Sequence, residues 1–310
     1  MKILVTGCAG FIGSHLCERL LNENYQVYGV DNLNDYYAIK KKLDNLRVLY
    51  NYENFDFKKE DIVTTNIIDE VEPDVVIHLA AMAGVRTSLN KPKLYVRVNV
   101  EGQINLLDQC VKNKVKKFIY ASSSSVYGMN DKVPFCENDF ISKVNSPYAA
   151  TKRSGEIMAQ LYNQLYNLPV IGLRFFTVYG PRGRPDMAPY KFLNAISNGI
   201  KFDKYGDGSS YRDYTYIDDI VDGIMGTINC DKTCEIYNLG NSNTVSLNEF
   251  IKTCEEVTGK EALYNQLPNQ KGDVPKTYSD ISKAKKDLGY NPKVNLKEGL
   301  SRMYGWFKNL

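Results

Sequence analysis

The sequence predicts an α/β fold built on a doubly wound parallel sheet, with a smaller second region after it. Three features indicate this fold. Short apolar runs alternate with stretches of helical spacing, a glycine-rich turn links the first run to the first such stretch, and the alternation ends near residue 176. Strands that alternate with helices form right-handed crossovers, which place the strands parallel and the helices on both faces of the sheet.

Six strands and three helices are predicted in the first half of the chain. Each strand is a short apolar run, the third being the weakest, and the strands cover residues 2–6, 25–30, 54–57, 74–79, 117–121 and 170–175. Helices are predicted where apolar residues recur three and four positions apart, over residues 11–22, 94–111 and 148–166. The alternation stops after the sixth strand, so we place a domain boundary after residue 175.

The chain beyond that boundary has a different pattern. Prolines and glycines are frequent just after it, which is typical of loops. A strand is predicted over residues 235–239, and helices are predicted to start at Ser246, Asp280 and Leu296. Ser246 and Glu249 have the spacing of a capping box. The predicted domains are therefore residues 1–175 and 176–310.

Composition excludes several classes of protein. With 43% hydrophobic and 24% charged residues, the chain has ample material for a core and is not a disordered protein. A net charge of +3 over 310 residues provides no broad field for nucleic acid or an anionic membrane, and no apolar run is long enough to span a bilayer. The 2 His and 7 scattered Cys have neither metal-site nor disulfide spacing, so we expect no metal and a cytoplasmic location.

A glycine-rich turn follows the first predicted strand and opens the first predicted helix. Gly7 permits the tight turn, Gly10 lets backbone N–H groups approach a pyrophosphate, and Gly13 lets the helix pack on the strand. The helix N-terminus adds a favourable partial positive charge. Asp31 ends the second strand, where a carboxylate can accept hydrogen bonds from a ribose 2′-OH and repel the 2′-phosphate of NADP. The pattern therefore predicts NAD as the cofactor.

Further cofactor contacts are expected around this turn and after the neighbouring strands. Residues 61–62 follow the third strand and suit the adenine, while residues 79–81 follow the fourth strand and suit the phosphate and ribose. The additional residues predicted to bind NAD are Phe11, Ile12, Asn32, Asp61, Ile62, Leu79, Ala80 and Ala81.

A tyrosine and a lysine four residues apart open the predicted helix over residues 148–166. Tyr148 and Lys152 would lie on one helix face, and an ammonium beside a phenol lowers the phenol pKa from about 10. Such a phenol can take a proton from a sugar hydroxyl. The serines at 122–125 end the fifth strand, and ligands of open α/β sheets bind at the carboxyl ends of strands. We therefore expect these groups to form one site.

Six motifs, in their order and spacing, resemble the extended short-chain dehydrogenases/reductases of the NAD-dependent nucleotide-sugar epimerase/dehydratase family: TGCAGFIG, HLAA, YASSSSVYG, YAATK, LRFFTVYGP and RDYTYIDD. The resemblance implies an NAD-binding Rossmann domain with a smaller, interleaved nucleotide-sugar domain. It implies that Ser123, Tyr148 and Lys152 are catalytic and that Asn99 contacts cofactor-side structure. It also implies that Arg212 contacts the UDP diphosphate and that Asp273 contacts the substrate ribose.

The same resemblance narrows the reaction. Dehydratases of the family carry Thr-Asp-Glu at the positions where this chain has serines, 123–125. Decarboxylases usually carry a glutamate in the same turn. The resemblance therefore favours a 4-epimerase. The strings DNLNDYY, AGVR and RGRPDMA resemble UDP-glucuronate 4-epimerases. Arg184, in the last string, is the match for the partner of the sugar carboxylate, with Arg182 in reserve, because a guanidinium pairs bidentately with a carboxylate.

The resemblance therefore implies NAD-dependent conversion of UDP-glucuronate to UDP-galacturonate through a 4-keto sugar. UDP-glucose 4-epimerisation and UDP-glucuronate decarboxylation remain alternatives. A homodimer is implied, formed through the helices over residues 94–111 and 148–166. The residues expected to bind the UDP-uronic acid are Arg86, Ser123, Ser124, Ser125, Thr177, Arg184, Tyr205, Arg212 and Asp273.

Overall fold

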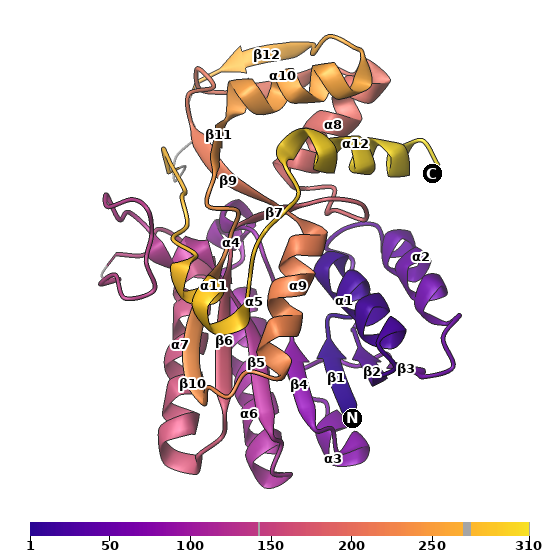
Figure 1. Ribbon diagram of the computed structural model, residues 1–310, viewed down its shortest axis with the longest axis vertical. Coiled ribbons are helices and arrows are strands. Elements are labelled where there is room, and N and C mark those ends of the chain that lie inside the picture. Colours follow the sequence, from indigo (N-terminus) through magenta and orange to yellow (C-terminus); the bar gives the residue numbers. More distant parts are fainter. Residues whose placement is uncertain (142, 269–273, 310) are drawn as a thin grey trace.

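The computed structural model describes residues 1–141, 143–268 and 274–309 (Figure 1). Its largest sheet, among these residues, has seven strands in the order β10-β6-β5-β4-β1-β2-β3, and every neighbouring pair is parallel. The order reverses between β1 and β4, which is where ligands bind in sheets of this class. The strands are β1 Lys2–Thr6, β2 Gln26–Val30, β3 Phe55–Lys58, β4 Val75–His78, β5 Lys117–Ser123, β6 Val170–Phe175 and β10 Cys234–Leu239.

Apolar side chains on both faces of this sheet are covered by helices, because residues along a buried strand point alternately to either side. Ile3 and Val5 of β1 belong to the core on one face, and Leu4 belongs to the core on the other. The first face is covered by α1 Phe11–Asn22, α2 Ile39–Leu49, α9 Ile217–Ile228 and α11 Ser282–Leu288. The second is covered by α3 Ile67–Val71, α6 Gly102–Lys112 and α7 Pro147–Tyr166. The predicted doubly wound α/β fold is therefore confirmed.

The smaller part of the molecule lies beyond the carboxyl ends of these strands, at the top of Figure 1. It has a three-stranded sheet in the order β11-β9-β7 and a parallel pair formed by β8 and β12. Its elements are β7 Thr177–Tyr179, α8 Ala188–Asn198, β8 Phe202–Tyr205, β9 Tyr211–Tyr216, β11 Thr244–Ser246, α10 Leu247–Thr258, β12 Tyr264–Leu267 and α12 Leu296–Phe307.

The predicted helix over residues 94–111 contains a change of helical type. It is continuous from α5 Pro92–Val96 through a π-helical stretch, η1 Arg97–Glu101, into α6. Such stretches often occur at functional sites. A separate short helix, α4 Val85–Asn90, precedes them. The predicted capping box is confirmed at the start of α10. The Ser246 hydroxyl accepts from the backbone N–H of Glu249 at 3.1 Å, and the Glu249 carboxylate accepts from the backbone N–H of Ser246 at 2.8 Å.

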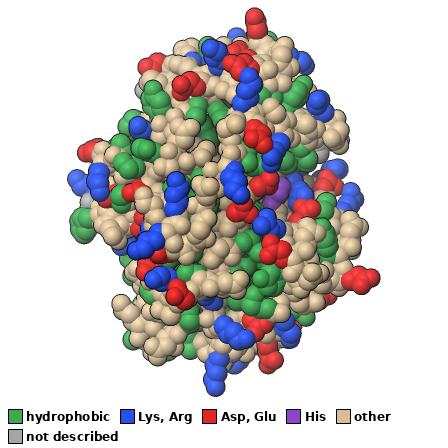
Figure 2. All heavy atoms as spheres, viewed as in Figure 1, with side chains coloured by type: hydrophobic (Ala, Val, Ile, Leu, Met, Phe, Trp, Pro, Cys, Tyr) green, Lys and Arg blue, Asp and Glu red, His purple; other side chains and the backbone are tan. Residues whose placement is uncertain are grey.

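Two features of the surface bear on the expected partners. Basic and acidic side chains are interspersed on the face shown in Figure 2, in keeping with the small net charge. Within the described parts of the chain, every helix is too short or too polar to serve as a transmembrane segment.

Candidate functional site

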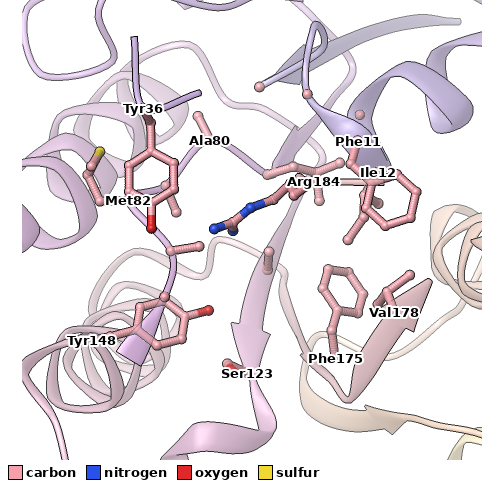
Figure 3. Close-up of a pocket in the computed structure, with 18 of the residues that line it drawn as sticks. Phe11, Ile12, Tyr36, Ala80, Met82, Ser123, Tyr148, Phe175, Val178 and Arg184 are labelled. Carbon is pink, nitrogen blue, oxygen red and sulfur yellow. The ribbon is translucent and has the colours of Figure 1, made fainter. Parts of the chain in front are cut away.

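A cavity of about 370 Å³ opens at the carboxyl ends of β1, β4 and β5, beside the reversal of strand order (Figure 3). It brings together most of the residues that the sequence predicts for cofactor and substrate. Those in its wall are Gly7, Gly10, Phe11, Ile12, Gly13, Asp31, Asn32, Ile62, Leu79, Ala80, Ala81, Ser123, Ser124, Ser125, Tyr148, Lys152, Thr177 and Arg184.

The glycine turn is shaped so that no side chain would fit at two of its three glycines. Gly7 has φ +75°, and a Cβ added there would lie 2.8 Å from the backbone nitrogen of Ala80. A Cβ at Gly13 would lie 2.1 Å from the Gly7 carbonyl oxygen. Gly10 is the N-cap of α1 and provides no side-chain cap, so the first N–H groups of the helix face the cavity side. This cradle fits the pyrophosphate of a dinucleotide.

Asp31 lies at the end of β2 in a buried ion pair that sequence reasoning missed. Its Oδ1 accepts from the backbone N–H of Leu33 at 2.8 Å and from Nζ of Lys42 at 3.2 Å. The side chains of Asp31 and Lys42 are 7% and 6% exposed, and both residues line the cavity. The lysine comes from α2, a helix with no strong apolar signal. A carboxylate paired in this way remains suited to a ribose hydroxyl and adds a cation beside it.

Two predicted cofactor contacts lie behind the cavity wall. Asp61 accepts from Nδ2 of Asn32 at 3.2 Å and lines a neighbouring cavity of about 480 Å³. Asn99, in the π-helical stretch, accepts from the N–H of Met82 at 2.7 Å and donates to the Met82 carbonyl at 2.9 Å and to the Thr151 hydroxyl at 3.0 Å. Asn99 therefore ties the loop after β4 to α7, and its role toward the cofactor stays a prediction.

Tyr148 and Lys152 lie in the first two turns of α7, with Tyr148 turned toward Ser123 (Figure 3). Burial raises the pKa of Tyr148 above its usual value of 10, and a hydrogen bond with Ser123 and the charge of Arg184 oppose this rise. Burial lowers the pKa of Lys152 to about 8. Its Nζ donates to the carbonyl of Ala121 at 2.7 Å. The net direction for Tyr148 is therefore a raised pKa and not the lowered one expected, because desolvation of the phenolate dominates.

The serine turn after β5 is a 3-10 helix, η2 Ser124–Tyr127, capped by Ser123. The Ser123 hydroxyl donates to that of Ser125 at 3.0 Å and accepts from the Ser125 backbone N–H at 3.2 Å. The turn thus presents adjacent hydroxyls to the cavity beside the Tyr148 phenol. Such a group of hydroxyls can orient a sugar oxygen for proton transfer.

Arg184 projects into the middle of the cavity from the loop after β7 (Figure 3). Its Nε and Nη2 donate to the two oxygens of Asp186 at 3.0 and 2.6 Å, and its guanidinium lies 5.2 Å from the centre of the Tyr36 ring. Burial lowers the pKa of Arg184, but the bonds to Asp186 outweigh it and leave the pKa raised. Asp186 occupies one edge of the guanidinium, so a substrate carboxylate would pair with the remaining donors.

Arg182, the reserve for that role, points elsewhere. Its guanidinium forms an ion pair with Glu18 of α1, and the neighbouring Pro181 carbonyl accepts from Nε2 of His15 at 2.9 Å. The loop that carries Arg184 is therefore anchored to the helix that begins at the glycine turn. Unlike Arg184, Arg182 is not among the residues that line the cavity.

Three residues predicted to bind the substrate lie outside the wall of the cavity of about 370 Å³, and their contacts with substrate stay predictions. The guanidinium of Arg86, on α4, lies 5.6 Å from the ring centre of Tyr205, on β8, so these two contact each other across the two parts of the molecule. Arg212 lies on β9, where its Nη1 donates to the carbonyl of Tyr211 at 2.8 Å. These three residues were predicted from the family resemblance alone, and a resemblance between sequences gives no distance between side chains. The last predicted substrate residue, Asp273, falls outside the described residues.

Comparison with known proteins gives the same fold. The family model described as GDP-mannose 4,6 dehydratase matches residues 4–303. The chain is 43% identical to the UDP-glucuronate 4-epimerase of Thermodesulfobacterium geofontis, with 98% of this chain and 95% of the relative covered. It is similar to the crystal structure of Bacillus cereus UDP-glucuronic acid 4-epimerase in complex with UDP-glucuronic acid and NAD, with a TM-score of 0.94, 40% identity, and 100% and 99% of the chains covered.

A solved epimerase for a neutral sugar is nearly as similar. The crystal structure of the UDP-glucose 4-epimerase of Thermotoga maritima with UDP-glucose has a TM-score of 0.91 and 35% identity, with 100% of this chain and 99% of the other covered. With a doubly wound parallel sheet, a glycine cradle, and a tyrosine, lysine and serine at one cavity, the chain belongs to the GDP-mannose 4,6 dehydratase family of NAD-dependent epimerases and dehydratases.

Proposed function

We propose that the protein interconverts UDP-glucuronate and UDP-galacturonate by NAD-dependent epimerisation at C4. The observation that carries the proposal is that Arg184 shares one cavity with Tyr148 and Ser123 (Figure 3). The cavity therefore holds both a cation, Arg184, and a candidate proton acceptor, Tyr148. A sugar that carries a carboxylate needs both groups, the cation to bind the carboxylate and the acceptor to take the hydroxyl proton. The similarity to UDP-glucuronate 4-epimerases of two organisms supports the same substrate.

The residues of the chain are assigned roles by their positions. Ser123 orients the C4 hydroxyl of the sugar, and Tyr148 as phenolate takes its proton. Ser123 and Arg184 favour that phenolate, and the Lys152 ammonium holds it and the nicotinamide ribose. When bound, oxidised NAD supplies a hydride acceptor for C4 and a positive charge that favours the phenolate. The 4-keto sugar then rotates within the site and presents its opposite face. The hydride returns to C4 from that face, and Tyr148 returns the proton to the C4 oxygen.

Arg184 has a second task in this scheme. Oxidation at C4 leaves a β-keto acid, which loses carbon dioxide when the breaking C–C bond aligns with the carbonyl π system. A guanidinium that holds the carboxylate out of that alignment protects the sugar. Because Asp186 and Tyr36 hold Arg184 on two sides, the guanidinium is restrained enough to do so.

We assign the remaining predicted residues to the two ligands by region. The glycine cradle, Asp31 and the ends of β3 and β4 hold NAD within residues 1–175. Residues 176–310 hold the UDP-sugar, with β10 returning to the large sheet, and Arg212 is assigned to the diphosphate. Arg86 on α4 and Tyr205 on β8 contact each other, and both are assigned to the UDP moiety.

We also infer a homodimer and a cytoplasmic location. Ile157, Leu161 and Leu165, four residues apart on α7, are 51%, 39% and 60% exposed, and they form an apolar stripe suited to a second copy of the helix. The seven cysteines are unpaired, in keeping with a reducing compartment. Sedimentation of the purified protein tests the dimer.

One experiment tests the function. The purified protein is incubated with UDP-glucuronate and separately with UDP-glucose, and the products are resolved by NMR while NADH absorbance is followed. We expect UDP-galacturonate without net NADH. UDP-galactose as the sole product would indicate the UDP-glucose epimerase, an alternative favoured by the engagement of Arg184 with Asp186. A UDP-pentose would indicate a decarboxylase, and steady NADH would indicate a simple dehydrogenase.

A further inference from the structure

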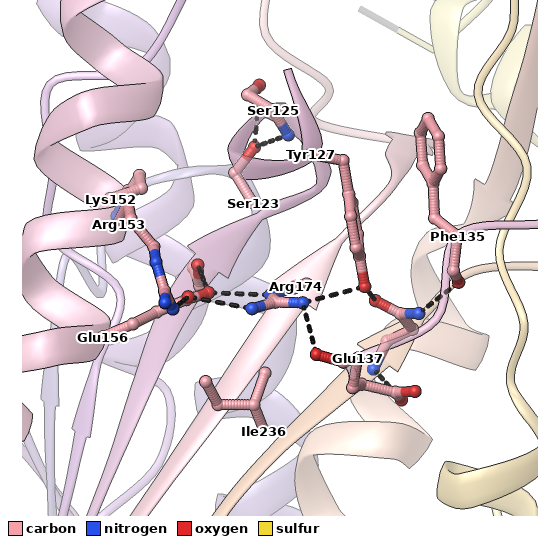
Figure 4. A network of polar contacts seen from close by, with 12 residues as sticks. Ser123, Ser125, Tyr127, Phe135, Glu137, Lys152, Arg153, Glu156, Arg174 and Ile236 are labelled. Carbon is pink, nitrogen blue, oxygen red and sulfur yellow. Dashed lines mark hydrogen bonds and ion pairs between the residues drawn. The ribbon is translucent and has the colours of Figure 1, made fainter. Parts of the chain in front are cut away.

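A buried ion pair lies directly behind the proposed catalytic groups (Figure 4). Glu156 of α7 and Arg174 of β6 are 0% and 1% exposed. The Arg174 Nε and Nη2 donate to the two oxygens of Glu156 at 2.8 and 3.0 Å. Isolated buried charges are costly, and a pair of this kind persists only where further hydrogen bonds satisfy it.

The further bonds of the pair reach both ends of the serine turn. The hydroxyl of Ser122, just before the turn, donates to Glu156 Oε1 at 2.6 Å. The hydroxyl of Tyr127, at its end, accepts from Arg174 Nη1 at 2.9 Å and donates to Oδ1 of Asn238 on β10 at 2.7 Å. Ser122 and the three residues that follow it, 123–125, line the cavity, whereas Glu156 and Arg174 do not. The Glu156–Arg174 pair thus fixes the turn from behind without touching the cavity.

The same pair lies one helical turn from Lys152. Residues four apart on a helix are neighbours, so the Glu156 carboxylate faces the lysine stem from within the protein. Burial lowers the pKa of Lys152, and the charge of Glu156 opposes that fall. On β4, burial and the charge of Lys152 lower the pKa of His78 to about 3, so this histidine is neutral. The charged or titratable groups that act on Lys152 are Glu156 on α7 and His78 on β4. Behind them, Arg153 on α7 and Arg174 on β6 bind Glu156, and Tyr95 on α5 packs on Tyr148 one helical turn before the lysine.

We propose that Glu156 is a positioning residue: it holds the serine turn in place through Ser122 and Arg174 and keeps Lys152 in its charged form. Without the carboxylate, Arg174 and Arg153 would leave uncompensated positive charge behind the lysine. Arg153 donates to Glu156 Oε2 at 2.8 Å and its side chain is 33% exposed, which makes it a removable second cation. The kinetic part of this inference rests on the proposed epimerase function.

Glu156→Gln is the decisive variant, measured as holoenzyme with UDP-glucuronate and UDP-glucose. We expect kcat to fall roughly 10- to 100-fold from misplacement of the turn. The alkaline limb of the kcat–pH profile should move about one unit to lower pH, while KM changes little because the pair does not reach the cavity. Arg153→Gln should move that limb to higher pH, and the double variant should restore it in part. A purely structural defect would not produce opposite shifts.

Hydrogen exchange provides a readout that needs no sugar. In Glu156→Gln, the amides of residues 122–128 should exchange about tenfold faster, while those of the glycine turn keep their rates. An unchanged alkaline limb, or unchanged exchange in that turn, would overturn the inference. If Glu156→Gln does not fold, Arg153→Gln provides the test. A shift of the alkaline limb of its kcat–pH profile to higher pH would support the inference, and an unshifted limb would overturn it. If the wild-type protein does not convert UDP-glucuronate, the proposed function is rejected. The hydrogen-exchange test would still be valid, because it needs no sugar.

Discussion

Asp186 binds Arg184 at two points, with Nε and Nη2 of the arginine 3.0 and 2.6 Å from its two carboxylate oxygens. The arginine proposed to recognise a carboxylate is therefore already bound to a carboxylate of its own loop. A uronate would meet a guanidinium whose orientation is set and whose charge is partly neutralised. Selection of the acidic sugar then depends on the geometry of the remaining donors as well as on charge.

Arg184→Ala should weaken turnover of UDP-glucuronate by about 30-fold or more. Removing one partner of a desolvated charge pair costs about 2–5 kcal/mol, and about 1.4 kcal/mol corresponds to a factor of ten. Residual activity on UDP-glucose should hardly change, and some UDP-4-keto-pentose or UDP-pentose should form. Steady-state kinetics with both sugars and NMR of the products provide the measurement.

Arg182→Ala is the matched control for that variant. Arg182 pairs with Glu18 of α1, so its loss should lower the melting temperature modestly and leave the preference between sugars as it was. Equal slowing of both sugars by Arg184→Ala would mean that the arginine positions the nucleotide or the loop, and the uronate assignment would lose its chemical support.

Tyr148→Phe should reduce kcat by about 100-fold or more while UDP-sugar binding is retained, because the variant removes a proton acceptor and keeps the ring. The ring lies edge-on to Tyr95 at 6.2 Å, a contact that phenylalanine preserves. Ser123→Ala should be milder, since the Ser125 hydroxyl is 3.0 Å from that of Ser123. Calorimetric binding beside turnover would separate the two effects, and near-normal turnover of Tyr148→Phe would exclude it as the base.

Asp31→Ala should relax discrimination against NADP. The variant removes the carboxylate that repels a 2′-phosphate and leaves Lys42, 3.2 Å away in the wild type, as a cation without that partner. Affinities for NAD and NADP measured by fluorescence titration test this. Adding Lys42→Met should remove most of the gain in NADP affinity. An unchanged ratio of the two affinities in Asp31→Ala would count against a role at the ribose.

Activity should fall as the pH rises through about 8. Burial lowers the pKa of Lys152 to about 8 from an ordinary value of 10.5. Its ammonium form is therefore present below that pH and lost above it. The kcat of the holoenzyme across pH 6–10 should show this alkaline limb. A plateau that extends to pH 10 would show that the charge of Lys152 is not needed.

Local sequence patterns predicted the parts of the site that are local in the chain. The glycine turn, the strand ends and the Tyr148–Lys152 spacing each fall within one turn or element, so their placement followed from the order of strands. Lys42 and Asp186 were missed because their importance arises from contacts with Asp31 and Arg184 that the folded loops create. The pKa of Tyr148 was misjudged because burial cannot be read from helical spacing.

The weaker elements were missed for a related reason. Helix α2 carries three consecutive lysines at 40–42 in its first turn, so its apolar pattern is weak. It is recognisable only once Leu46 and Leu49 pack on the core. Strands β8 and β12 pair with each other although they lie about 60 residues apart in the sequence, and only one of their residues, Lys204, is buried. Such elements depend on tertiary partners more than on propensity.

Strand β10, Cys234–Leu239, lies at the edge of the large sheet although the chain has already passed through β7, β8 and β9 of the smaller part. During synthesis, β6 must wait for more than fifty further residues before its outer edge is paired. A chain that ended near residue 175 would expose that edge and leave Tyr127, which accepts from Arg174, without its partner Asn238. The large parallel sheet is therefore complete only when a strand from beyond residue 230 has joined it, so residues 1–175 alone lack one of its seven strands.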